Sequence, residues 1–258
     1  MSSVQEHYES LLAKHYIWMT GIPFDEKVRE QRLLIEKIVK EFGTSGSIGL
    51  ALDLGSGPGF QSLALAELGF SPILAIDTST ELLKELTARV GSCDIKAIKT
   101  DLTNLGSISV DQKANLVLCM GDTLTHLPSK QQVQKFFTDV LDKLSKDGIF
   151  VITYRDLTTE LTGTDRFIPV RSDEEKVMIC FLEFENSESV LVHDLVHLRG
   201  PDGGVLEKSC YRKLRLPQSW VSRELENAGF RVLSEGLVGR FTSLIARNEC
   251  PILGSGRS

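Results

Sequence analysis

The stretch ALDLGSGPGF combines an acid with three glycines at the end of a short apolar run. Asp53 closes the run, and Gly55, Gly57 and Gly59 alternate with other residues after it. Glycine lets the backbone come close to a ligand, so a strand that turns through such residues into a helix is typical of nucleotide-binding loops. A tight turn without a ligand would use the same residues, and the glycines alone do not separate the two interpretations.

Two neighbouring residues favour a cationic ligand over a dinucleotide. The dinucleotide fingerprint has glycine at its sixth position, where helix and strand pack closely around a pyrophosphate. Phe60 stands at that position in this sequence. An acid directly before the loop, Asp53, would also repel a pyrophosphate and attract a positive charge. A nicotinamide-dependent dehydrogenase is therefore the least favoured interpretation.

Two further acids follow later apolar runs. Asp77 ends the run PILAID, and Asp101 follows IKAIKT. Taken singly, each acid is as well explained as the cap of a helix or a turn. Together with Asp53 they place three carboxylates at the carboxyl ends of three successive strands, which is the edge where open α/β sheets bind ligands.

Apolar runs of strand length alternate with amphipathic segments up to Tyr154. The expected helices are residues 4–19, 25–42, 60–68, 81–90 and 130–144, with Asp25 as an N-cap, and the expected strands are residues 50–54, 72–77, 95–99, 114–120 and 148–154. This alternation predicts a parallel sheet with helices on both faces.

The pattern changes after Tyr154. Three strand-like runs at residues 176–185, 189–199 and 205–216 are joined by the turn sequences NSE and GPDGG, which predicts an antiparallel meander. A helix near 218–227 and strands at 230–236 and 241–247 then resume the earlier chemistry. We expect an N-terminal helical lid (1–45), an α/β core (46–160 and 215–248), an antiparallel β insertion (161–214) and a tail (249–258).

The acid and the alternating glycines resemble motif I of the class I S-adenosylmethionine-dependent methyltransferases. Asp53, Gly55, Gly57 and Gly59 fit all of its fixed positions. The resemblance implies a Rossmann-like fold with a seven-stranded mixed sheet. It also implies S-adenosyl-L-methionine as the cofactor, whose ammonium and sulfonium groups agree with the acid at Asp53.

The resemblance assigns further residues to the cofactor. Asp77 is expected to accept the ribose hydroxyls. In the resembling family the position of Asp101 hydrogen-bonds the adenine amino group, and the next residue, Leu102, contacts the ring through its backbone. Aromatic side chains suit contact with a sulfonium and with adenine. The remaining residues expected at the cofactor are Tyr16, Thr78 and Met120.

Two segments point to the methyl acceptor. GDTLTHL resembles the GNS…HL segment of glycine and sarcosine N-methyltransferases, and YRDLT resembles their HRNYD. In that family the arginine pairs with the substrate carboxylate, which implies the same role for Arg155; a structural ion pair is the alternative. Asp122 stands where those enzymes have asparagine, so it could hold an ammonium, accept a proton or neutralise Arg155. His126 is the expected partner of Asp122, although a packed helix-start histidine is equally consistent.

Composition and other motifs narrow the classes of function. The 258 residues carry a net charge of -6, which argues against nucleic acid or an anionic membrane as the main partner. The chain lacks the Asn/Asp-Pro-Pro-aromatic tetrad of base-amine methyltransferases and the Pro-Cys nucleophile of cytosine enzymes. His193 and His197 fall on a strand, where they lie about 13 Å apart, so we expect no metal.

The five cysteines are scattered, and the first residues show no secretory signal, so we expect a cytoplasmic protein. The favoured function is in-line methyl transfer to a small molecule, such as an amine or an amino-acid-like acceptor. A methyltransferase of protein or RNA and a non-catalytic S-adenosylmethionine-binding regulator are the alternatives. The insertion would cover the acceptor pocket or form a contact in a homo-oligomer, and the sequence names neither the acceptor nor the pathway.

Overall fold

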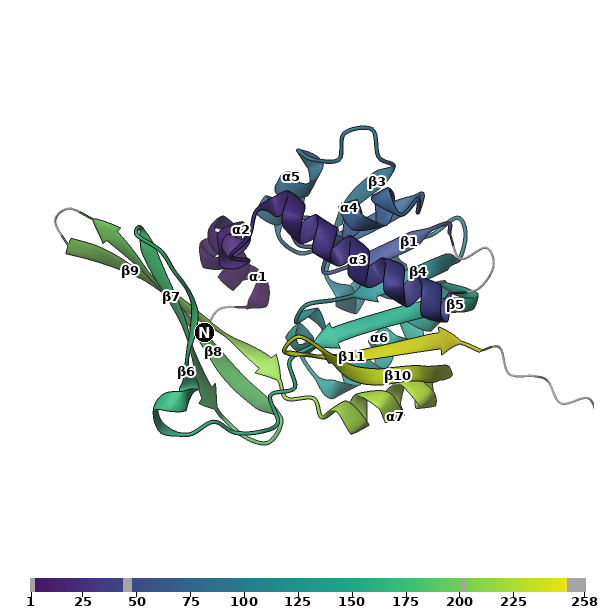
Figure 1. The fold of residues 1–258 in the computed structure, drawn as a ribbon. Helices are drawn as coiled ribbons and strands as arrows, with labels where there is room; N and C mark the ends of the chain where they lie inside the picture. The colour runs from purple at the N-terminus through teal and green to yellow at the C-terminus, as the bar shows by residue number, and fades with distance from the viewer. Residues whose placement is uncertain (1–2, 44–47, 201–202, 250–258) are drawn as a thin grey trace, which may run out of the picture.

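The computed structural model describes residues 3–43, 48–200 and 203–249. Its larger sheet has seven strands in the order β10-β11-β5-β4-β1-β2-β3 (Figure 1). Neighbours among β1 to β5 run parallel, whereas β11 is antiparallel to both β5 and β10, so the sheet is mixed as expected. The strands are β1 (Ala51–Leu54), β2 (Ile73–Asp77), β3 (Ile95–Lys99), β4 (Ala114–Cys119), β5 (Leu144–Tyr154), β10 (Phe230–Val238) and β11 (Phe241–Asn248).

Helices cover both faces of this sheet because its central strands are apolar on both sides. Leu116 of β4 belongs to one buried cluster with α3 (Phe24–Phe42) and α4 (Phe60–Glu67), and Val117 belongs to another with α6 (Lys130–Lys143) and α7 (Gln218–Ala228). Successive residues of a strand point to opposite faces, which explains this division. The fifth helix, α5 (Thr80–Thr87), packs beside β2 and β3.

The N-terminal segment departs from the expected single helix over residues 4–19. It is divided into α1 (Val4–His7), a π-helical turn η1 (Tyr8–Leu12), a 3-10 turn η2 (Ala13–His15) and α2 (Tyr16–Met19). The segment makes contacts on two sides where the type of helix changes. His7 Nε2 lies 2.9 Å from Asp194 of a second, smaller sheet, and Glu9 accepts a hydrogen bond from the backbone of Thr80 at 2.6 Å. The prediction of Asp25 as an N-cap is also wrong, because Pro23 occupies that position and α3 begins one residue earlier.

The expected meander is present, with one strand more than the sequence predicted. Its order is β6-β7-β8-β9, with each neighbour antiparallel. The additional strand β6 is short and irregular between Pro169 and Arg171, which hid it in the sequence. The strands are β6 (Phe167–Ser172), β7 (Lys176–Phe184), β8 (Ser189–Gly200) and β9 (Gly203–Leu214). Part of the expected turn GPDGG (201–202) and the expected tail from residue 250 lie outside the described residues.

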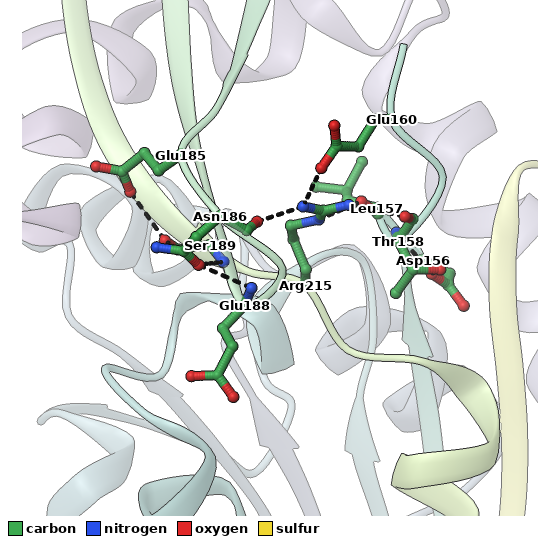
Figure 2. A network of polar contacts seen from close by, with 9 residues as sticks. All are labelled: Asp156, Leu157, Thr158, Glu160, Glu185, Asn186, Glu188, Ser189 and Arg215. Atoms are coloured by element: carbon green, nitrogen blue, oxygen red, sulfur yellow. Dashed lines mark hydrogen bonds and ion pairs between the residues drawn. The ribbon is translucent and has the colours of Figure 1, made fainter.

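Figure 1 shows this small sheet beside the core, with α1 and α2 between the two. Arg215 is buried and lies in the segment that runs from the small sheet back to the core. Its side chain binds the segment after β5, which runs from the core to the small sheet (Figure 2). Its Nε donates to the carbonyl of Leu157 at 3.0 Å, and its Nη2 donates to that of Thr158 at 2.8 Å. Its Nη1 donates to Glu160 Oε1 at 2.7 Å and also to the carbonyl of Asn186. One side chain therefore links the two segments that connect the core to the small sheet.

Among the described residues, no helix combines the length and apolar character needed to cross a membrane.

Candidate cofactor and acceptor site

A cavity of about 1200 Å³ lies where the glycine turn, the N-terminal segment and the small sheet meet. Its core side is formed by residues at the carboxyl ends of β1, β2 and β4. Most of the residues singled out in the sequence line this cavity. They are Tyr16, Gly55, Gly57, Asp77, Thr78, Asp101, Leu102, Met120, Asp122, His126 and Arg155.

Two expected cofactor residues do not line the cavity. Asp53 is 1% exposed and accepts a hydrogen bond from Ser62 Oγ at 2.5 Å, within the core. Burial raises the pKa of its carboxyl to about 7, so near neutral pH it carries much less charge than the sequence argument assumed. Gly59 has a φ of 94°, and a Cβ there would lie 2.2 Å from Leu86. These two residues shape the turn and its packing from behind the cavity wall.

Gly55 and Gly57 do form the wall of the cavity. Both have a positive φ, at 75° and 55°, which favours glycine. A Cβ on Gly55 would collide with Thr123 at 2.2 Å. The atoms nearest to a Cβ on Gly57 would be those of the Tyr16 side chain, the first at 3.7 Å, so glycine here leaves this part of the cavity open.

The acids at the sheet edge lie beside this opening. Asp77 Oδ2 accepts from the backbone N–H of Gly57 at 2.8 Å, and Oδ1 accepts from that of Ser79 at 2.8 Å. Burial raises the pKa of Asp77 in spite of these bonds. Asp101 Oδ1 accepts from the backbone N–H of Thr103 at 2.8 Å, so this acid also caps η3 (Leu102–Ser107).

The composition of this half of the cavity fits S-adenosylmethionine. The cofactor offers hydroxyl and amino donors, and the carboxylates of Asp77 and Asp101 are acceptors. Its adenine and sulfonium suit the apolar and aromatic surfaces that Leu102, Met120 and Tyr16 present to the cavity. Burial raises the pKa of Tyr16 to about 12, so the ring keeps its hydroxyl proton at neutral pH.

The other half of the cavity is organised around Asp122. Its Oδ1 accepts from the backbone N–H of Arg155 at 2.9 Å, and its Oδ2 accepts from Arg155 Nη1 at 2.6 Å. Lys213 Nζ donates to the same Oδ2 at 2.8 Å. Burial acts to raise the pKa of Asp122, but the charges of Lys213 and Arg155 hold it well below its usual range. Asp122 is therefore a fixed anion shared by two cations.

His126 lines the cavity, but no hydrogen bond joins it to Asp122, the partner expected from the sequence. Its Nε2 is shielded from solvent and has no hydrogen-bond partner among the described residues. The ring lies edge-on to Tyr8 and Tyr211, at centroid distances of 5.7 and 5.5 Å. Burial and the charge of Lys213 lower the pKa of His126 to about 3, so the imidazole is neutral at physiological pH.

The sequence analysis missed the residues that the small sheet contributes. Tyr211 and Lys213 lie two apart on β9, so both point to the face that lines the cavity. Asp194 of β8 also lines it and lies 2.9 Å from His7 Nε2 in a buried pair. The alternation along the strand was the available sequence signal, because it puts Lys213 on the same face as Tyr211.

Part of this chain matches a known protein family. Residues 51–148 match the family described as methyltransferase domain. These residues contain the glycine turn, Asp77, Asp101 and Asp122. The match ends before the small sheet, which begins at Phe167.

A curated glycine/sarcosine N-methyltransferase of Aphanothece halophytica is 24% identical over 154 residues, which are 58% of this chain and 56% of that protein. The match therefore spans little more than half of that relative's length. The solved structure of the CcbJ methyltransferase from Streptomyces caelestis aligns with a TM-score of 0.75 at 16% identity, covering 94% of this chain and 98% of that one. The sugar N-methyltransferase KedS8 from Streptoalloteichus sp ATCC 53650 aligns with a TM-score of 0.71 at 14% identity, covering 92% of each chain. Both alignments cover more than nine-tenths of this chain, so the shared fold extends beyond the family match into the small sheet.

Proposed function

We propose that this chain is a class I S-adenosylmethionine-dependent methyltransferase that methylates the nitrogen of a small acceptor that also bears a carboxylate. The observation that carries this proposal is the arrangement of Asp122 between Arg155 and Lys213. Two cations share one carboxylate, so the cluster retains an excess positive charge. An acceptor carboxylate is the natural counterion for that charge.

The same charge favours the reactive form of an amine. An aliphatic amine in water is protonated at neutral pH, as the reference pKa of about 10.4 for lysine shows, and an ammonium has no lone pair for attack. Nearby cations disfavour the ammonium and lower its pKa. Arg155 and Lys213 would therefore hold the carboxylate and also favour the neutral amine.

His126 provides the polar group that such an amine needs. Its Nε2 has no hydrogen-bond partner among the described residues, and the ring is neutral. After a small rotation of the ring that exposes Nε2 to the cavity, a bound amine would satisfy this nitrogen and be oriented by it. When bound, S-adenosylmethionine supplies an electrophilic methyl group on a sulfonium that leaves readily. Much of the remaining catalysis then comes from positioning the acceptor in the cavity.

The surroundings favour a small acceptor. Tyr8 of the N-terminal segment and Tyr211 of the small sheet flank His126, so the acceptor half is bounded from two sides. The glycine/sarcosine and sugar N-methyltransferases among the similar proteins are named for small acceptors. A protein or RNA substrate would need a longer open surface at this point.

A screen of acceptors tests the proposal. The purified chain is incubated with S-adenosylmethionine and one acceptor at a time: glycine, sarcosine, an amino sugar, amines without a carboxylate, and carboxylates without an amine. Released S-adenosylhomocysteine and the mass of the product are measured. We expect turnover with amines that carry a carboxylate. Turnover only with protein or RNA, or cofactor binding without any turnover, would contradict the proposal.

A further inference from the structure

The turn between β10 and β11 forms part of the wall of the cavity. Val238 pairs with Phe241 across this hairpin, so the two residues between them, which are Gly239 and Arg240, form its turn. Gly239 has a φ of 60°, whereas Arg240 has no positive φ, which is the pattern of a type II′ turn. All four residues line the cavity, and Figure 1 shows the turn at the end of the large sheet that is nearer the small sheet. The short turn therefore fixes the backbone of Arg240 beside the cavity.

Arg240 lies a short distance beyond Arg155. β11 pairs with β5 as far as Thr242 and Tyr154. The next residues of the two strands, Phe241 and Arg155, lie side by side, and the guanidinium of Arg155 is 4.9 Å from the centroid of the Phe241 ring. With strands about 4.8 Å apart and a rise of about 3.3 Å per residue, the backbone of Arg240 is within about 10 Å of that of Arg155. The acceptor half of the cavity therefore continues from Arg155 to Arg240.

Arg240 differs from the other cations that line the cavity. Lys27, Arg155, Arg212 and Lys213 each contact a carboxylate at 2.6 to 2.8 Å. The side chain of Arg240 is exposed and has no ion pair or hydrogen bond to any residue that the structure describes. A guanidinium carries five N–H donors and no acceptor, and it binds carboxylates and phosphates through two parallel hydrogen bonds. Arg240 is therefore a free binding group for an anion.

We propose that the methyl acceptor carries a second anionic group, a carboxylate or a phosphate, and that Arg240 binds it. This inference rests on the proposed function, in which the first carboxylate of the acceptor is the counterion of Arg155 and Lys213. That carboxylate leaves Arg240 without a partner, so a second anion is needed to pair with it. Val238 and Phe241 line the cavity beside Arg240 and suit the carbon chain that joins the two anionic groups. Because Arg240 is exposed, we expect it to act on selectivity between acceptors in a salt-dependent way.

Three matched pairs of amino acids test this inference by calorimetry on protein saturated with S-adenosylhomocysteine. The members of each pair share the amine and the first carboxylate, and only one of them has a second anionic group: aspartate against asparagine, glutamate against glutamine, and O-phosphoserine against serine. We expect wild-type protein to bind the doubly anionic member of at least one pair about five- to twentyfold more tightly at low salt, and to discriminate less at high salt. The first two pairs report a second carboxylate and the third reports a phosphate, so the pairs identify the anion.

Arg240→Gln and Arg231→Gln are matched variants. Both remove one exposed arginine from the same hairpin, but Arg231 is paired with Glu249 at 2.6 Å and does not line the cavity. We expect Arg240→Gln to bind the two members of each pair with affinities within about twofold of each other, and Arg231→Gln to keep the wild-type preference. Arg240→Lys keeps the charge but not the two parallel donors, so it should keep part of the preference.

The possible failures separate this inference from the proposed function. Wild-type affinities within about twofold in all three pairs, or a preference that Arg240→Gln retains, would overturn the inference. If asparagine, glutamine or serine is still methylated in that case, the proposed function stands without it. If wild-type protein neither binds nor methylates any of the six amino acids, the proposed function fails and the inference fails with it.

Discussion

Lys213 Nζ lies 2.8 Å from Oδ2 of Asp122, although 91 residues separate the two in the chain. Asp122 follows β4 of the core, and Lys213 belongs to the last strand of the small sheet. Because this contact crosses from one sheet to the other, the insertion contributes a charged group to the acceptor half of the cavity. The insertion therefore covers the cavity and also supplies a charged side chain to it.

Replacing Lys213 by methionine should impair acceptor binding while sparing the cofactor. Methionine keeps most of the length of the side chain but removes the cation that shares Asp122 with Arg155. With one cation and one anion left, the cluster loses its excess charge, and we expect KM for a carboxylate-bearing acceptor to rise about 10- to 100-fold. Steady-state kinetics measure this, and calorimetry should show S-adenosylhomocysteine affinity within about twofold of wild type.

Lys208→Met is the control for this change. Lys208 lies on the same strand, opposite Leu195 of β8, and does not line the cavity. Its loss should leave KM for the acceptor unchanged. Equal effects of the two variants, or a loss of cofactor affinity in Lys213→Met, would show that the Lys213 charge does not act at the acceptor.

His126→Gln should lower kcat/KM about 10- to 100-fold without changing the shape of its pH profile. The pKa of His126 is held at about 3, so its imidazole is neutral at every pH above about 5 and cannot produce a limb near neutrality. A limb there would report the acceptor amine or Asp53, whose pKa is about 7. If the variant loses a limb that the wild type shows between pH 6 and 7, His126 titrates in the reaction, and our description of it as a neutral orienting group is wrong.

Gly57→Ala and Gly163→Ala form a matched pair. Both glycines have a φ of 55°, so alanine should cost each variant a similar amount of stability, about 1–2 kcal/mol. Only Gly57 lines the cavity, whereas a Cβ on Gly163 would meet nothing within 4 Å. We expect Gly57→Ala to weaken S-adenosylhomocysteine binding at least tenfold by calorimetry and Gly163→Ala to leave it unchanged. Equal affinities would remove the glycine turn from the cofactor site.

The core could be predicted from the sequence because its signals are local. Apolar runs of strand length, helix-length amphipathic segments and the residues of the glycine turn identify the elements without knowledge of their neighbours. The carboxyl ends of parallel strands meet at one edge, so Asp77 and Asp101 were expected together, and both line the cavity. Residues 51–148, where the family model matches, are also the part of the chain where these local signals are strongest.

The remaining features depend on contacts between distant segments. Lys213 meets Asp122 only after the insertion folds against the core, and the breaks in the N-terminal helix coincide with contacts of His7 and Glu9 on two sides. The negative charge of Asp53 could not be judged from the sequence. Its position before the glycines was identified, but its burial, which raises its pKa to about 7, is a property of the folded core.

Asp53 should also give the protein a distinctive pH dependence of stability. Its folded pKa, about 7, lies above its unfolded value, so the folded state binds more protons between about pH 4 and 7. The contribution of Asp53 to the free energy of unfolding is therefore fully present below pH 4 and is lost as pH rises through 7, a change of a few kcal/mol. Urea unfolding of wild type and Asp53→Asn at pH 5 and pH 8 measures it. We expect the wild type to lose stability relative to the variant at pH 8; a difference that does not depend on pH would refute the raised pKa.

Arg215→Met tests how much the hydrogen bonds of this one side chain stabilise the connection between the small sheet and the core. Arg215 is 4% exposed and donates to the carbonyls of Leu157, Thr158 and Asn186 and to Glu160 (Figure 2). Its loss removes the four hydrogen bonds of a buried guanidinium, so we expect the free energy of unfolding to fall by about 3 kcal/mol. Arg212→Met is the comparison, because Arg212 also binds a carboxylate, that of Glu185. Its side chain is 49% exposed, so its loss should cost less than about 1 kcal/mol.

Equal losses in urea unfolding would mean that the connection between the small sheet and the core depends on packing of the long Arg215 side chain rather than on its hydrogen bonds. A loss confined to Arg215→Met, accompanied by a higher KM for the acceptor, would show that the connection also holds Lys213 in place beside Asp122.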